Sequence, residues 1–209
     1  MNRTETINYI IKKNNYKSYL EIGTHCGWNY DYIIIDNKEC CDVDDSYHEL
    51  TYHMSSDEMF ARMPIDKKYD IIFIDGLHNE LFVHRDIINS LKHLNAGGII
   101  CVHDVIANDY SAVSEVFNGG TWNGDVYKAI CNLSNLNIEY YTLFNEDSGL
   151  TLIKYYECPY ELQISDIRAK IKYNYIFDDH FISNDLNHIT KQGKYVLHLI
   201  TEDELDSIL

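Results

Sequence analysis

The stretch of sequence that decides the fold is YLEIGTHCGW, residues 19–28. Its apolar run ends at Glu21-Ile22-Gly23 and a second glycine follows at Gly27, which is typical of a strand that turns sharply into a ligand-holding loop and then a helix. A loop that binds a dinucleotide needs the spacing G-x-G-x-x-G, because its second glycine lets the backbone touch the pyrophosphate. His25 stands at that position here, so the sequence disfavours NAD.

Strand and helix patterns alternate on both sides of this stretch. The run YDIIFID, residues 69–75, is almost continuously apolar, as expected of a central strand buried on both faces. Ser55 and Glu58 predict a capping box before a short helix. Further strands are predicted at 18–22, 39–43, 49–54 and 99–104, a hairpin at 136–144 and 149–155, and helices at 4–14, 28–35, 56–63, 81–94 and 126–133. This order predicts an α/β fold with a doubly wound, mostly parallel sheet.

Composition limits the classes of function. The chain has 209 residues and a formal net charge of −16, which argues against nucleic acid and anionic lipid as partners. No apolar run has the length of a membrane span and the N-terminus lacks signal-peptide features, so we expect a cytoplasmic protein with reduced, mostly buried cysteines. We expect one domain over residues 1–158 and, over 159–209, a mainly helical appendage that covers the core, the active site or a second subunit.

The polar residues at the predicted strand ends suggest the ligand. In an open parallel sheet, ligands bind beyond the carboxyl ends of the strands. The spacing E-x-G-x-x-x-G, with Asp42 at the end of the next strand, suits a ligand that contains an adenosine and an amino acid but no phosphate, namely S-adenosylmethionine. Asp42 can accept hydrogen bonds from both ribose hydroxyls, with Asp44 as the alternative if that strand is longer. A turn that needs its glycines for conformation alone remains the other interpretation.

Six motifs together resemble one family. They are YLEIGTHCGW, CDVDDS, MSSDEMFARM, YDIIFIDGLHNE, DIINSLKHLNAGGIICVHD and WNGDVYKAI, in this order. They are similar to the class I S-adenosylmethionine-dependent methyltransferases of the branch marked by FIDGLH and GG-x-I-x-x-HD. The resemblance implies a Rossmann-like sheet of seven strands whose last two form a hairpin. It also implies cofactor contacts, which we assign to Glu21, Gly23, Thr24, Gly27, Asp42, Ser56, Asp57 and Asp75.

The same resemblance implies a reaction centre around Asp75, His78, His103 and Asp104. Methyl transfer to a hydroxyl needs in-line alignment and a group that takes the proton, and we expect His103 to be this base, with His78 as second choice. Asp75, His103 and Asp104 could instead bind a divalent ion, with manganese favoured over magnesium by the histidine. Each aspartate taken alone could equally cap a neighbouring loop.

Two positions depart from the family pattern, and two further segments are considered for the site. Glu80 stands where the family often has an aromatic residue, and the large Trp28 follows the second glycine. Trp122 lies on a long loop that could wall the substrate site. The run Asp178-Asp179-His180 is interpreted as a solvated surface segment.

We therefore predict a methyltransferase that methylates a hydroxyl of a small molecule, with a sugar or nucleotide-sugar of glycan biosynthesis as the first choice by analogy. Two other classes stay open, a non-catalytic module that binds the cofactor or a partner, and a metal-dependent hydrolase. The chain could also form a homo-oligomer, with the C-terminal appendage pairing two subunits.

Overall fold

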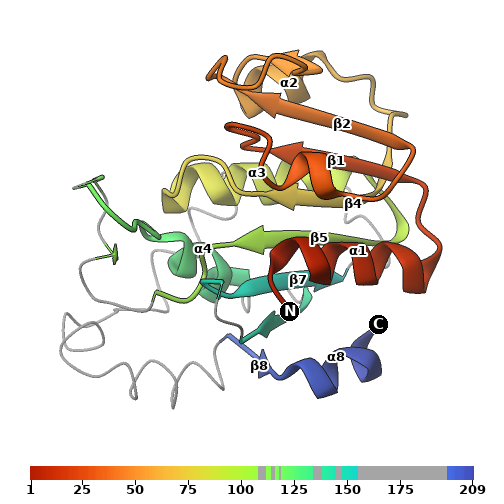
Figure 1. The fold of residues 1–209 in the computed structure, drawn as a ribbon, viewed down its shortest axis with the longest axis vertical. Coiled ribbons are helices and arrows are strands. Elements are labelled where there is room, and N and C mark those ends of the chain that lie inside the picture. Colours follow the sequence, from red (N-terminus) through yellow and green to blue (C-terminus); the bar gives the residue numbers. More distant parts are fainter. Residues whose placement is uncertain (108–111, 114–115, 118, 134–137, 145–146, 155–196) are drawn as a thin grey trace.

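The computed structural model describes residues 1–107, 112–113, 116–117, 119–133, 138–144, 147–154 and 197–209. These residues form one sheet with the strand order β3-β2-β1-β4-β5-β7-β6-β8, flanked by helices on both faces (Figure 1). The strands are β1 Ser18–Ile22, β2 Asn37–Asp42, β3 Tyr52–His53, β4 Tyr69–Ile74, β5 Leu94–His103, β6 Glu139–Leu143, β7 Leu150–Lys154 and β8 Leu199–Ile200. The helices are α1 Arg3–Asn14, η1 Tyr30–Tyr32, α2 Ser56–Arg62, α3 Glu80–Lys92, α4 Val126–Leu133 and α8 Glu202–Ile208.

The topology confirms the predicted doubly wound, mostly parallel sheet. Strands β3, β2, β1, β4 and β5 run parallel, whereas β7 is antiparallel to both β5 and β6. The strand order reverses between β1 and β4, which places a topological switch point at the carboxyl ends of these two strands. The loop after β1 and the loop after β4 therefore meet there.

Side chains of the central strands alternate between two hydrophobic cores. Leu20, Ile72 and Ile74 pack on the face that carries α2, α3 and α4. Tyr19 and Phe73 pack on the opposite face, with α1, η1 and α8. Because successive residues of a strand point to opposite faces, a strand covered on both sides must be apolar at nearly every position. This accounts for the continuous apolar run that identified β4.

One predicted element is wrong: the helix over 28–35 is a single 3-10 turn, η1. The run Ile33-Ile34-Ile35 is β-branched, which disfavours a helix. The backbone N–H of Ile34 donates to Asn8 Oδ1 at 2.8 Å instead of to the carbonyl of Tyr30. Lys38 Nζ takes that carbonyl at 2.7 Å. Contacts from α1 and β2 thus replace the hydrogen bonds that would extend the helix.

Residues 197–209 extend the sheet beyond the seven strands expected. Strand β8 pairs in parallel with β6, so the predicted hairpin does not form the edge. Helix α8 lies beside α1, and Lys13 Nζ contacts Asp206 Oδ1 at 2.8 Å (Figure 1). The division at residue 158 stays a prediction, because the chain on both sides of that residue lies outside the described ranges. Among the described residues, no helix has the length and apolar character needed to cross a bilayer.

Gly23 is the tightest point of the switch region. Its φ is +87°, and a Cβ on this residue would lie 2.1 Å from the carbonyl oxygen of Asp75 and 2.5 Å from the nitrogen of Gly76. Asp75 N–H donates to the carbonyl of Ile22 at 2.8 Å and holds the two loops at this distance. Both the backbone conformation and the close approach therefore require glycine.

We expect Gly23→Ala to lower the free energy of unfolding by about 3 kcal/mol or more, because left-handed strain and overpacking add. Gly97→Ala is the matched control, since Gly97 has a φ of +76° but no atom within 4 Å of a built Cβ. This control should lose only about 1 to 2 kcal/mol. Urea unfolding followed by circular dichroism measures both changes. Equal losses in the two variants would contradict the packing argument.

Candidate active site

A cavity of about 750 Å³ opens at the carboxyl ends of β1, β2, β4 and β5. This volume lies in the range of small-molecule sites. The structure brings most of the predicted site residues to its wall: Glu21, Gly23, Thr24, Asp42, Ser56, Asp75, His78, His103 and Asp104. Two predicted residues are not among those lining the cavity. Gly27 makes room for the ring of Tyr47, and Asp57 pairs with Arg85 at 2.8 Å.

Glu21 is a buried carboxyl group at the floor of the cavity. It accepts hydrogen bonds from the hydroxyl of Tyr19 and from Asn29 Nδ2, the latter at 2.7 Å. Burial raises the pKa of Glu21 to about 7, although both hydrogen bonds act in the opposite direction. A carboxyl group with this pKa can exist in either protonation state near neutral pH, so it can adapt to a charged ligand.

Asp42 is the last residue of β2, as the prediction required. Its Oδ2 accepts the backbone N–H of His25 at 2.7 Å, and its Oδ1 accepts the N–H of Asp44 at 2.9 Å. One carboxylate has about four acceptor positions, so Asp42 can hold the glycine loop and still accept ribose hydroxyls. The alternative, Asp44, is exposed and bonds the N–H of Ser46 at 2.7 Å. The geometry therefore favours Asp42.

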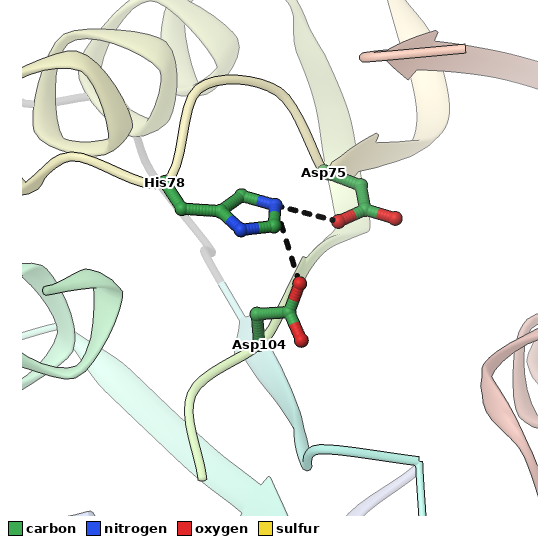
Figure 2. Close-up of side chains that lie close together, drawn as sticks. All are labelled: Asp75, His78 and Asp104. Atoms are coloured by element: carbon green, nitrogen blue, oxygen red, sulfur yellow. Dashed lines mark ion pairs between the residues drawn. The ribbon is translucent and has the colours of Figure 1, made fainter. Parts of the chain in front are cut away.

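Three side chains from two loops converge in the cavity: Asp75 and His78 follow β4, and Asp104 follows β5. Figure 2 shows the imidazole of His78 between the carboxylates of Asp75 and Asp104. His78 Nε2 lies 3.4 Å from Asp75 Oδ1 and 3.2 Å from Asp104 Oδ2. His78 Nδ1 lies 2.7 Å from the carbonyl oxygen of Trp122, which can only accept a hydrogen bond. In the neutral ring this contact places the proton on Nδ1 and the lone pair on Nε2, whereas the protonated ring donates from Nε2 to the two carboxylates.

The donor set of this group fits a divalent ion. One ligand atom each from Asp75, His78 and Asp104 lies within 4.8 Å of the other two. A histidine whose second nitrogen donates to a backbone carbonyl is the usual arrangement of a metal ligand. The sequence predicted Asp75, His103 and Asp104, and His103 Nδ1 lies 3.3 Å from Asp75 Oδ1 and 3.4 Å from Asp104 Oδ2. The structure adds His78 to this set.

His103 is deeply buried and both of its ring nitrogens face acceptors. Nδ1 lies 3.3 Å from Asp75 Oδ1, and Nε2 lies 2.8 Å from the carbonyl oxygen of Asp147. Burial alone would lower the pKa of His103, but the charges and hydrogen bonds of Asp75, Asp104 and Asp147 raise it well above its usual range. An imidazolium that donates from both nitrogens has no lone pair for a substrate proton. The geometry therefore favours a positioning role over the predicted base.

Asp75 is a carboxylate that forms an ion pair with this imidazolium. Burial raises the pKa of Asp75, but the charge of His103 and hydrogen bonds from His103 and His78 outweigh burial and lower it. The pKa of His78 is raised, because its contacts with Asp75 and Asp104 outweigh burial. Asp104 has a φ of +59°, and one of its oxygens accepts Asn123 Nδ2 at 2.8 Å. The loop after β5 thus holds Asp104 in a fixed orientation.

Comparisons with known proteins agree with this arrangement. The family model described as a methyltransferase domain matches residues 42–105. The matched stretch runs from the end of β2 to the loop after β5. A comparison with curated protein sequences finds no significant match.

Several solved structures have a fold similar to that of this chain. The O-methyltransferase from Bacillus cereus in complex with SAH has a TM-score of 0.55 and 14% identity, covering 73% of this chain and 80% of that chain. The O-methyltransferase TomG from Streptomyces achromogenes in complex with SAM has a TM-score of 0.57 and 14% identity, covering 74% and 80%. The SAH-bound methyltransferase PaMTH1 from Podospora anserina has a TM-score of 0.57 and 16% identity, covering 74% and 78%. At identities of 14–16%, these similarities show a shared fold.

Sequence reasoning missed three charged residues of the site. Arg3 and Asp147 line the cavity beside His103, and Asp86 of α3 lines it beside Ser56. A signal for Asp86 exists, because an acidic residue next to the apolar positions of a buried helix face is unusual. No local pattern indicates Arg3 or Asp147, since only the fold brings the start of α1 and the turn between β6 and β7 to the cavity.

The other positions singled out in the sequence lie in different surroundings. Trp122 lines the cavity and its ring stacks on His78, with centroids 5.1 Å apart. Glu80 begins α3 and accepts Asn132 Nδ2 at 2.9 Å, so it serves packing between α3 and α4. Trp28 is largely exposed at the rim. The run Asp178-Asp179-His180 lies outside the described residues.

The buried carboxyl group of Asp86 predicts how the free energy of unfolding depends on pH. Burial raises its pKa to about 7 in the folded protein, whereas the unfolded chain ionises this group near pH 4. The folded state therefore binds more protons between these values, and the free energy of unfolding should fall as the pH rises from about 4 to 7. In Asp86→Asn this fall should be smaller, by an amount on the order of 2 kcal/mol.

Urea unfolding at several pH values between 4 and 8 measures that slope. Glu21 has a raised pKa of the same sign, so the slope should be reduced and not abolished. Asp66→Asn is the control, because Asp66 is exposed. Parallel curves for the wild type and Asp86→Asn would contradict the prediction.

Proposed function

We propose that the protein transfers a methyl group from S-adenosylmethionine to a hydroxyl group of a small molecule. One observation carries this proposal: a single cavity at the switch point is lined by two groups of residues. The first wall holds Glu21, Gly23 and Asp42, and the second wall holds Asp75, His78 and Asp104. Similar solved structures include O-methyltransferases described in complex with SAH or SAM, which supports the cofactor and the reaction class.

The first wall offers what the cofactor needs. Gly23 lets the methionine part approach the backbone, and Asp42 accepts the ribose hydroxyls. Ser56 lines the neighbouring region, on the side assigned to adenine. With the cofactor placed in this way, its sulfonium is directed toward the second wall. An in-line displacement requires the acceptor oxygen to lie there.

At the second wall, Asp75, His78 and Asp104 would hold a divalent ion. Two carboxylates and one imidazole suit manganese or another transition ion better than magnesium. Such an ion lowers the pKa of a hydroxyl group that it binds. His103 donates to Asp75 and lies beside Asp104, and thus holds both carboxylates in place.

The lone pair of His78 Nε2 can serve one use at a time. It can be a ligand of the ion, or it can accept the proton of the substrate hydroxyl while Asp75 and Asp104 stabilise the imidazolium. Either use places the acceptor hydroxyl next to Nε2. Trp122 then forms the wall on which the rest of the acceptor lies.

The proposed acceptor is a small molecule with a ring, and a sugar or nucleotide-sugar of glycan biosynthesis is the first class to test. The ring face of Trp122 beside His78 is suited to cover such a ring. We place the reaction in the cytoplasm, which suits the five free cysteines among the described residues.

Calorimetric titration with S-adenosylmethionine and S-adenosylhomocysteine tests the cofactor. Both should bind, and Asp42→Asn should weaken binding about 10- to 100-fold, because a hydrogen bond to a charged acceptor is lost. Asp44→Asn is the matched control and should leave the affinity unchanged. Failure of both compounds to bind, with and without manganese, would overturn the methyltransferase proposal in favour of a hydrolase or a partner-binding module.

Titration with Mn²⁺ followed by electron paramagnetic resonance tests the ion. Asp104→Ala should weaken Mn²⁺ binding by about tenfold or more, since one of three protein ligands is lost. His25→Gln is the control, because His25 lines the cavity away from the cluster. Absence of Mn²⁺ binding to the wild type would exclude the ion and leave His78 as the proton acceptor.

A further inference from the structure

Arg3 brings a permanent positive charge to the cavity. Six carboxyl groups line the cavity, from Glu21, Asp42, Asp75, Asp86, Asp104 and Asp147. Within the described ranges, Arg3 is the only lysine or arginine that lines it. A chain with 33 acidic and 17 basic residues attracts cations by default, so an arginine inside an acidic cavity calls for a specific partner.

The position of Arg3 is fixed by its surroundings. It is the first residue of α1, whose first turn is closed by the capping box of Asn2 and Glu5. Asp147 Oδ2 accepts the backbone N–H of Arg3 at 2.9 Å, and Asp147 Oδ1 accepts Nη1 at 3.0 Å. Thr4 donates to Asn29 Oδ1 at 2.7 Å, which ties this turn to the loop after β1.

Asp147 satisfies only one edge of the guanidinium. Nε lies 3.9 Å from Asp75 Oδ2, beyond hydrogen-bond distance. Nη2 has no acceptor among the described residues. A guanidinium presents five N–H donors in a planar fork that matches a carboxylate. Arg3 is about three-quarters buried and aimed at the cavity, so its second edge is available to a ligand.

The neighbours of Arg3 locate that edge along the bound cofactor. Asn29, which contacts the first turn of α1, also donates to Glu21 at 2.7 Å. Asp75, on the other side of Arg3, follows β4 at the switch point. Arg3 therefore lies between the floor of the glycine loop and the reaction centre, where the amino-acid end of the cofactor belongs, and not at the adenine end near Ser56.

Resting on the proposed function, we infer that Arg3 binds the carboxylate of the methionine part of S-adenosylmethionine, with Asp147 positioning the guanidinium. The ammonium and sulfonium groups of the cofactor are attracted by the acidic wall. Its carboxylate is repelled by the same wall and needs one cation, and Arg3 supplies it. The contact selects cofactors that retain the complete amino acid.

Calorimetric titration with two ligands tests this assignment. S-adenosylhomocysteine carries the carboxylate, and S-adenosyl-3-thiopropylamine is the same compound without it. Arg3→Met should weaken binding of S-adenosylhomocysteine about 10- to 100-fold and leave binding of the thiopropylamine within about twofold. Arg3→Lys should recover part of the loss, because it restores the charge without the planar fork. Arg62→Met is the control, since Arg62 lies on the exposed side of α2.

The outcomes separate this assignment from the proposed function. Equal weakening of both ligands by Arg3→Met would overturn it and reduce Arg3 to a structural role, and so would an unchanged affinity for S-adenosylhomocysteine. If neither ligand binds to the wild type, the proposed function itself fails. Circular dichroism of each variant confirms that α1 still packs on the sheet.

Discussion

The contact between the loop after β1 and the loop after β4 is the constraint on which the rest of the structure depends. Gly23 approaches the backbone of Asp75 so closely that no other side chain fits, and the N–H of Gly23 donates to the carbonyl of Cys41 at 2.9 Å. Three parallel strands are thereby aligned at their carboxyl ends. Backbone contacts place the glycine loop, Asp42 at the end of β2 and Asp75 at the end of β4 relative to one another.

The cavity has to accommodate several carboxyl groups in a small volume, and the structure does so in two ways. Glu21 and Asp86 are buried without a cation in direct contact, and the pKa of each is raised to about 7. Asp147 is paired with His103 and Arg3, and its pKa is lowered to about 2. Because both devices limit repulsion, the site can retain enough negative charge to attract a sulfonium without unfolding the loops that form it.

Sequence reasoning succeeded where the signal is local. The apolar run of β4, the glycine loop and the position of Asp42 at the end of β2 each follow from neighbouring residues, and so does the Ser55 cap of α2. It failed over residues 28–35, where Asn8 and Lys38 take the hydrogen-bonding groups of a helix that the local pattern favoured. It also missed Arg3, Asp147 and β8, because these depend on contacts between segments that are far apart in the sequence.

The two histidines of the reaction centre show why residue type alone does not assign a role. His78 and His103 both contact Asp75 and Asp104, and both follow or end a central strand. The difference lies in the second nitrogen of each ring. In His78 it faces the carbonyl of Trp122, whereas in His103 it faces the carbonyl of Asp147 and Arg3 Nη1. The side chain of His78 is 19% exposed and that of His103 only 4%, so we propose His78 as the histidine that meets a substrate or an ion and His103 as the one that positions the carboxylates.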